Sequence, residues 1–137
     1  TYGYLKSEYD DYLADLSGDG VITDNSDLVP RNTPENTFGL TTSYTARVGS
    51  GDLKARISYR FRDSMESESQ NNPLGSLDSI HNVNANINYT INNYGISVWG
   101  RNITDEREQR WSTIGGLTSR GWWNEPATYG VTLSASF

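Results

Sequence analysis

The sequence has 137 residues, a net charge of −6 and a mean hydropathy of −0.67. It contains no run near the roughly 20 apolar residues that a transmembrane helix needs, which excludes a helical span within it. Cysteine is absent, so disulfides and thiol chemistry are excluded. A pI of about 4.6 argues against nucleic acid as a partner, because phosphate binding needs a basic surface. The length suits one domain at most.

The residue pattern along the chain predicts an all-β fold. Turn residues and alternating patterns define six antiparallel strands, at about 2–13, 37–48, 53–62, 82–91, 94–102 and 127–137. The first strand has the weakest pattern, because charged residues between Lys6 and Asp11 interrupt its alternation. We expect it to rise into the loop that follows.

Most of the other strands have one apolar and one polar face. From Leu53 to Arg62, odd positions are apolar and even positions are polar, mostly cationic; the runs 83–91 and 129–137 alternate likewise. Side chains alternate across a strand, so this pattern predicts a sheet with one apolar and one polar surface. The apolar surface meets either lipid or the core of a soluble β-sandwich.

The polar surface is predicted to be wet. Lys54, Arg56, Arg60 and Arg62 are expected beside Asn82, Asn84, Asn86 and Asn88 of the next strand. Unpaired buried charge is very costly, so these groups face solvent or a hydrated lumen. The candidate lumen-facing residues are Arg56, Arg60, Arg62, Asn84 and Asn86.

The connections alternate in length. Tight turns at about 48–52 and 92–93 contrast with polar loops at about 14–36, 63–81 and 103–126. Short turns at one end and long loops at the other are typical of outer-membrane barrels, whose strands cross the bilayer with about 9–11 residues. The apolar face also carries aromatic residues near strand ends, as membrane girdles do: Phe38, Phe61, Tyr94, Tyr129 and Phe137.

Three segments resemble a known family. Ile96–Glu106 (ISVWGRNITDE) resembles the penultimate-strand signature of TonB-dependent outer-membrane receptors. Glu125–Leu133 (EPATYGVTL), followed by the aromatic Phe137, is similar to their last strand, and Val29–Phe38 (VPRNTPENTF) to the entry of an earlier one. Two positions depart from the pattern: charged residues follow Asp105 where an aromatic is common, and Ala127 stands where arginine is common.

The resemblance implies that residues 1–137 are the C-terminal portion of a roughly 22-stranded barrel, with plug and earlier strands upstream. Thr1–Tyr4 shows no signal peptide, which suits a fragment. Six strands cannot enclose a lumen, so it would not transport alone. The implied location is the outer membrane of a Gram-negative bacterium. The implied partners are lipid, TonB through the plug, and the barrel-assembly machinery, which would read Tyr129, Gly130, Leu133 and Phe137.

The acidic segment after the first strand resembles the start of a calcium loop. Asp15, Ser17 and Asp19 place oxygens at alternate positions before Gly20, as in an EF-hand loop. The closing glutamate is missing, and Asp27 lies nearest to its place. The segment is therefore either a Ca²⁺ site or a solvated acidic turn in which Asp and Gly serve only geometry.

The last long loop carries the candidate ligand residues. Arg110, Trp111, Arg120, Trp122 and Trp123 combine planar donors with faces that stack on sugars or aromatic rings. They bind a ligand, or they pack against the plug or neighbouring loops; the lumen arginines likewise either guide a substrate or pair with the plug. The resemblance implies a bulky nutrient as cargo, with a ferric siderophore as the family default, whereas the Trp-rich loop suits an oligosaccharide. The acidic first loop argues mildly against strongly anionic cargo.

No nucleophilic triad, phosphate cradle or singled-out carboxylate pair emerges, so the sequence predicts no enzyme; the transport receptor is what the resemblance implies. No cofactor is required, and calcium is the one that the residues suggest. The alternative is a secreted soluble β-sandwich that binds carbohydrate through Trp122 and Trp123, with or without calcium. A simple porin is a third reading.

Overall fold

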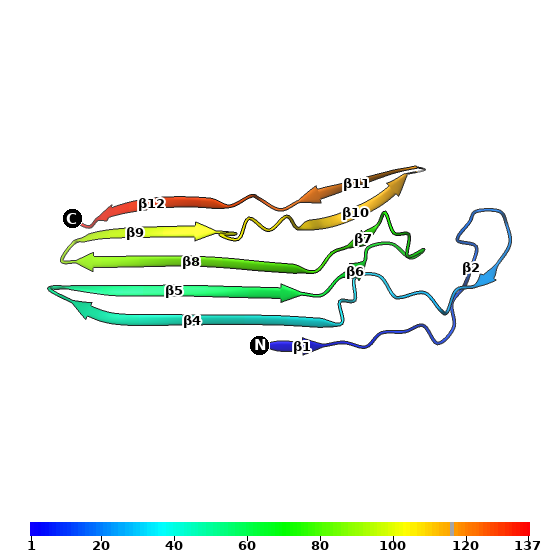
Figure 1. Cartoon of the computed structure of the whole chain (residues 1–137), viewed down its shortest axis with the longest axis horizontal. Coiled ribbons are helices and arrows are strands. Elements are labelled where there is room, and N and C mark those ends of the chain that lie inside the picture. The colour runs from blue at the N-terminus through cyan, green and yellow to red at the C-terminus, as the bar shows by residue number, and fades with distance from the viewer. Residues whose placement is uncertain (116) are drawn as a thin grey trace.

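The structure is a computed structural model that describes residues 1–115 and 117–137. Its main element is one antiparallel sheet of six strands (Figure 1). In spatial order these are β1 (Tyr2–Tyr4), β4 (Asn36–Val48), β5 (Gly51–Arg62), β8 (Ile80–Ile91), β9 (Tyr94–Arg101) and β12 (Thr128–Ala135). In the described part of the chain, no helix is long and apolar enough to cross a membrane.

The two ends of the sheet differ, as predicted. At the short-turn end, Gly49–Ser50 joins β4 to β5 and Asn92–Asn93 joins β8 to β9. Gly49 and Asn92 have positive φ angles of 59° and 50°, which glycine and asparagine tolerate in tight turns. At the opposite end, here called the hairpin end, the long connections contain three small hairpins. These are β2 (Leu13–Ala14) with β3 (Thr23–Asp24), β6 (Met65–Glu66) with β7 (Ser76–Leu77), and β10 (Gln109–Gly115) with β11 (Thr118–Trp123).

Two details of the prediction were wrong. The expected first strand, 2–13, pairs with β4 only over Tyr2–Tyr4, because the charged residues that follow have no alternating pattern to hold them in the sheet. The segment 103–126, expected as a loop, contains the β10–β11 hairpin. Six residue pairs between β10 and β11 give the backbone hydrogen-bond partners within the hairpin, where an irregular loop would rely on water.

The register confirms the two faces. Lys54 lies opposite Asn88, Arg56 opposite Asn86, and Arg60 opposite Asn82. On the other face, the side chains of Ile57 and Ile87 are about half exposed, with relative accessibilities of 49% and 52%.

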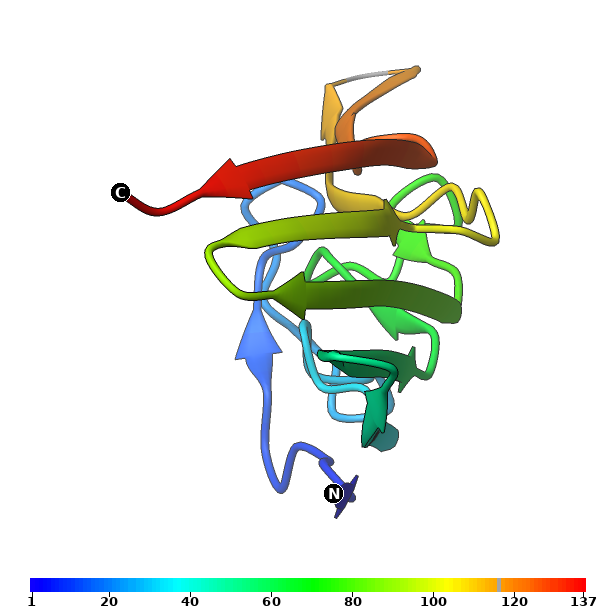
Figure 2. The same ribbon diagram turned by 90° about the vertical axis from the view of Figure 1, so that its left-hand side faces the viewer.

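No second sheet covers either face in the described residues, and Figure 2 shows the strands as one twisted layer. The only fully buried hydrophobic side chains among them, Leu77 and Ile80, lie at the hairpin end. A β-sandwich would need a second layer over the apolar face, so the sandwich alternative does not describe this structure.

Aromatic side chains line the apolar face near the hairpin end. Tyr2, Phe38, Phe61 and His81 lie opposite one another in a single row across four neighbouring strands. His81 Nδ1 lies 2.8 Å from the Tyr59 hydroxyl. Tyr94 stands at the short-turn end, and Phe137 follows β12 at that same end. Rings therefore occur at both ends of the apolar face, as in a membrane girdle.

Candidate functional site at the hairpin end of the polar face

Two hollows open on the polar face. The first, of about 560 Å³, lies where the face meets the β10–β11 hairpin and is here called the rim hollow. Its lining includes Arg60, Asn82, Asn84, Arg101, Arg110 and Trp123. The second, of about 580 Å³, continues along the face and is lined by residues that include Arg56, Asn84, Asn86, Trp99 and Arg101. Four of the five predicted lumen residues and two of the five predicted loop residues thus line these two hollows.

Asn102 holds the chain at the end of β9. It is 5% exposed and adopts a φ of 48°, which asparagine tolerates better than most residues. Its Nδ2 donates to the carbonyl oxygens of Glu106 and Glu125, both at 3.0 Å. Its Oδ1 accepts from Asn82 Nδ2 at 3.2 Å and from the Glu106 backbone N–H at 3.0 Å. One buried side chain therefore ties β8, the turn after β9 and the entry to β12.

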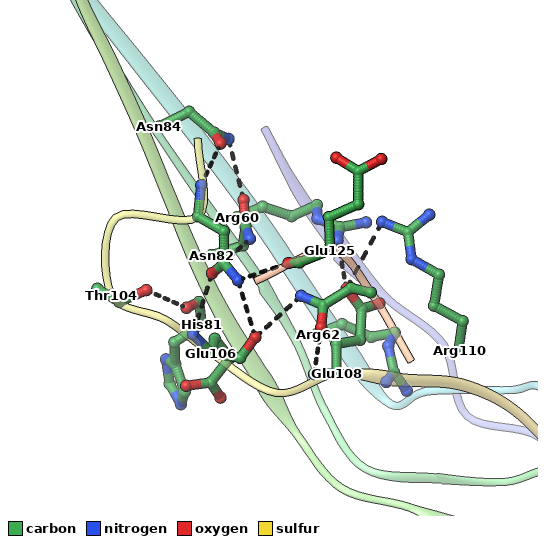
Figure 3. A network of polar contacts seen from close by, with 12 residues as sticks. Arg60, Arg62, His81, Asn82, Asn84, Thr104, Glu106, Glu108, Arg110 and Glu125 are labelled. Carbon is green, nitrogen blue, oxygen red and sulfur yellow. Dashed lines mark hydrogen bonds and ion pairs between the residues drawn. The ribbon is translucent and has the colours of Figure 1, made fainter. Parts of the chain in front are cut away.

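Three further asparagines, Asn82, Asn84 and Asn124, complete this network, and Figure 3 labels Asn82 and Asn84 within it. Asn84 Nδ2 donates to Asn82 Oδ1 at 2.9 Å, and Asn84 Oδ1 accepts from the Asn102 backbone N–H at 2.9 Å. Asn124 donates to the Glu106 carbonyl at 2.9 Å, and its Oδ1 accepts from the Glu108 backbone N–H at 3.0 Å. No role was expected for Asn102 or Asn124 from the sequence. The available signal was the position of Asn102 in the Asn-Ile-Thr-Asp segment.

Glu108 links the β10–β11 hairpin to the main sheet. Its side chain is only 8% exposed, and its Oε2 lies 3.0 Å from the Arg60 guanidinium and 4.0 Å from that of Arg110. A buried carboxylate requires such partners, because desolvation penalises an unpaired charge. Arg62, predicted to face the lumen, is turned to the base of the loops. It donates to the carbonyls of Asp63 at 3.0 Å and Asp78 at 3.2 Å.

The predicted ligand residues of the last loop all lie on the β10–β11 hairpin, but they do not form one cluster. The rings of Trp111 and Trp122 pack with centroids 5.3 Å apart. Trp123 and Arg110 line the rim hollow, whereas Arg120 lies opposite Thr113, nearer the hairpin tip.

Packing against β6–β7 fixes the hairpin. Ser112 is 1% exposed, its carbonyl accepts from Ser67 Oγ at 3.1 Å, and its own hydroxyl donates to the Leu74 carbonyl at 3.3 Å. The backbone N–H of Ile114 donates to Glu68 Oε1 at 2.6 Å. These contacts join residues that are 38 to 46 positions apart in sequence, so the hairpin is held by its neighbours at the hairpin end.

The acidic turn between β2 and β3 is organised by Asp15. Its carboxylate accepts from the backbone N–H groups of Gly18 and Gly20, both at 2.7 Å, and from Asp19 at 3.2 Å. The Ser17 hydroxyl also donates to it, at 3.2 Å. The Gly20 bond is the largest cause that holds the pKa of Asp15 below its ordinary value of 3.8. In the described residues, no three His, Cys, Asp or Glu side chains gather as a metal site. Calcium binding by Asp15, Ser17, Asp19 and Asp27 stays a prediction.

The predicted assembly residues follow the alternation of β12. Tyr129 and Leu133 lie on the apolar face, opposite Gly100 and Ile96, whereas Gly130 lies on the polar face opposite Trp99. The Tyr129 hydroxyl donates to the Ile103 carbonyl at 3.2 Å. Phe137 lies beyond the strand and is fully exposed.

The chain forms a single antiparallel sheet with one apolar and one polar face, short turns at one end and long connections at the other. This is the fold of a partial outer-membrane β-barrel. Among solved structures, the chain is similar to the ferric yersiniabactin uptake receptor FyuA from Yersinia pestis, with a TM-score of 0.72 and 16% sequence identity. The match covers 85% of this chain and 19% of the receptor, so the chain spans a minor part of the receptor's length. No family model and no curated protein matches the sequence.

Proposed function

We propose that the chain is the C-terminal wall segment of a TonB-dependent outer-membrane receptor that takes up a bulky nutrient. The observation that supports this most is the uncovered apolar face, with aromatic rings at both ends, behind a polar face that carries arginine and asparagine. Lipid would cover the first face, and a hydrated lumen would meet the second. The fold likeness to an uptake receptor agrees with this arrangement.

The proposal assigns the remaining roles to the whole protein. Strands upstream of Thr1 would complete a barrel of about 22 strands, and an upstream plug would receive energy from TonB. The barrel-assembly machinery would read β12 and the aromatic residue that follows it. The cargo would be a ferric siderophore or an oligosaccharide, held near the β10–β11 hairpin. The receptor would perform no catalysis.

The orientation gives a direct test. The proposal places the hairpin end outside the cell and the short-turn end in the periplasm. The segment has no native cysteine, so Leu117→Cys on the hairpin and Asn92→Cys on the short turn report the two ends. In intact cells that express the full-length protein, a membrane-impermeant maleimide should label Leu117→Cys and leave Asn92→Cys unlabelled until the outer membrane is permeabilised.

The full-length parent without an added cysteine gives the background of this assay, and outer-membrane fractionation confirms that each variant is assembled. Equal labelling of both positions in intact cells, or labelling of Asn92→Cys alone, would contradict the proposal. Recovery of the unmodified full-length protein in the soluble fraction would contradict it as well.

A further inference from the structure

A third hollow opens on the apolar face, between β8, β9 and β12, and is here called the apolar hollow. It measures about 490 Å³, and its lining includes Ala85, Ile87, Val98, Ile103, Tyr129 and Val131. In the register, Ala85 lies opposite Gly100, and Gly100 lies opposite Tyr129, so two small residues stand side by side in one row. The next row toward the short turns carries the larger side chains of Ile87, Val98 and Val131. The hollow therefore exists because Ala85 and Gly100 lack the side-chain volume of their neighbours.

The walls of the apolar hollow are fixed by contacts within the chain. Ile103 and Tyr129 lie over Gly100, where a Cβ atom would come within 2.5 Å of Ile103 Cγ2 and 2.9 Å of Tyr129 Cδ1. The Tyr129 hydroxyl donates to the Ile103 carbonyl at 3.2 Å, and the Ile103 backbone N–H donates to the Val83 carbonyl at 2.9 Å. The hollow is thus formed before a ligand arrives, as most small-ligand sites are.

The chemistry of the lining selects an apolar ligand. Asn86 and Trp99 also border the hollow, but the strand alternation turns their side chains to the polar face. The Tyr129 hydroxyl is already bonded to the Ile103 carbonyl. The described residues of this lining therefore offer neither a charge nor a free hydrogen-bonding side chain, and a sugar or an ionic group would be desolvated here without compensation.

The position of the apolar hollow indicates which apolar ligand it meets. In a membrane barrel, lipid borders the apolar face, and aromatic rows lie at the headgroup level. Ala85 lies four residues along β8 from His81, the last member of the aromatic row at the hairpin end, and four strand residues span about 13 Å. The hollow therefore lies below that row, among the acyl chains of the leaflet at the hairpin end. Three neighbouring strands span about 10 Å, a width that suits one hydrocarbon chain and not the roughly 1,000 Å² of a stable protein interface.

We propose that the apolar hollow binds one acyl chain of a lipid in that leaflet, in preference to the rest of the apolar face. This inference rests on the proposed function, because it requires the apolar face to lie in a membrane. It adds a defined binding site to a face that otherwise meets lipid evenly.

The test uses the full-length protein in phosphatidylcholine vesicles that contain a trace of phosphatidylcholine with a photoreactive diazirine on one acyl chain. After illumination, mass spectrometry of the peptides maps the lipid adducts. Adducts at Ile103 and Val131 should be at least about fivefold more frequent than at Ile57, because a chain in the hollow buries more of its methylene groups than a chain on the open face. Ile57 is the reference at matched depth, since it lies opposite Ala85 and is 49% exposed.

Two variants separate the hollow from the face around it. Ala85→Phe fills the hollow and should lower the adducts at Ile103 and Val131 by about fivefold, to the level of the open face. Ala46→Phe makes the same change on the apolar face of β4, opposite Leu53 and two strands from β8, and should leave those adducts unchanged. Outer-membrane fractionation of each variant shows that it is assembled.

Three results would overturn the inference. Equal adducts at Ile103, Val131 and Ile57 would mean that lipid covers the face evenly, and an equal fall in Ala46→Phe would mean that the hollow is not what holds the chain. Adducts that spare only the hollow would mean that another occupant, such as a second copy of this chain, fills it. Failure of the receptor proposal itself would look different, because the whole apolar face would then lack adducts and the cysteine labelling described above would fail as well.

Discussion

The indole ring of Trp99 on β9 covers Gly130 on β12, directly opposite it in the register. A Cβ atom at Gly130 would lie 2.3 Å from Trp99 Cζ2, so the ring occupies the space of a side chain. Trp99 Nε1 also donates to Thr132 Oγ1 at 3.3 Å. On the apolar face the strands exchange roles, so that β12 carries the ring and β9 the glycine. A Cβ at Gly100 would lie 2.9 Å from Tyr129 Cδ1. Aromatic cover of a strand glycine fixes register, which accounts for the Tyr-Gly pair of the last strand.

Gly130→Ala should therefore destabilise the pairing of β9 with β12. The methyl group forces the Trp99 ring away from the strand, and overpacking of this kind costs about 1–3 kcal/mol. Urea unfolding of the full-length protein, followed by tryptophan fluorescence, measures the loss. Gly115→Ala is the matched control, because a Cβ there meets no atom within 4 Å. An equal effect of the two variants would show that the ring does not fill this space.

The two faces predict opposite outcomes for one added charge. Arginine at Ile87, on the apolar face, should cost about 2–4 kcal/mol near the bilayer midplane. Arginine at Asn86, the neighbouring residue on the polar face, should be tolerated, because that face is wet. The yield of folded full-length protein in the outer membrane measures both variants. Equal damage from Asn86→Arg and Ile87→Arg would refute the wet-lumen assignment.

Asn102→Ala should loosen the base of the β10–β11 hairpin, where the chain enters from β9 and leaves toward β12, while the sheet and the hairpin's contacts with the β6–β7 segment persist. The change removes four side-chain hydrogen bonds and places alanine at a φ of 48°. Since an unsatisfied buried group costs about 1–3 kcal/mol, hairpin cleavage by protease should be much faster than in the parent. Asn102→Gly relieves only the backbone strain and should recover part of the loss. Asn88→Ala, on the same strand face as Asn82, should have no effect, and equal cleavage in this control would contradict the role of Asn102.

Period-two patterning explains why so much of the sheet could be predicted. That Arg56 and Asn86 lie on the same polar face follows from alternation, which is a local pattern. The same alternation places Trp99 with Ser97 and Arg101 on the polar face. The Glu108–Arg60 pair joins residues 48 positions apart, and the Ser112–Leu74 bond residues 38 apart. No local pattern encodes such contacts, so the docked hairpin could not be predicted.

Calcium binding at the β2–β3 turn is open to a simple titration. The predicted ligands are Asp15, Ser17, Asp19 and Asp27, although the Asp15 carboxylate already accepts four hydrogen bonds from its own turn. If the turn binds calcium, titration of the full-length protein releases or absorbs heat, and Asp19→Ala abolishes that heat. No heat in either protein would contradict the calcium prediction and leave the acidic turn with a structural role.

The Asp15 turn should loosen in acid. Its pKa is held below the ordinary 3.8, chiefly by the Gly20 N–H and against some desolvation. A group whose pKa is lower in the folded state stabilises that state above its unfolded pKa, and the contribution is lost as pH falls through the folded pKa. A spin label at Val21→Cys should therefore stay restrained down to about pH 4 and become mobile below it. Asp15→Asn should be mobile already at pH 7, whereas a label at Leu117→Cys should not respond. A label that is still restrained in Asp15→Asn at pH 7 would show that another group organises the turn.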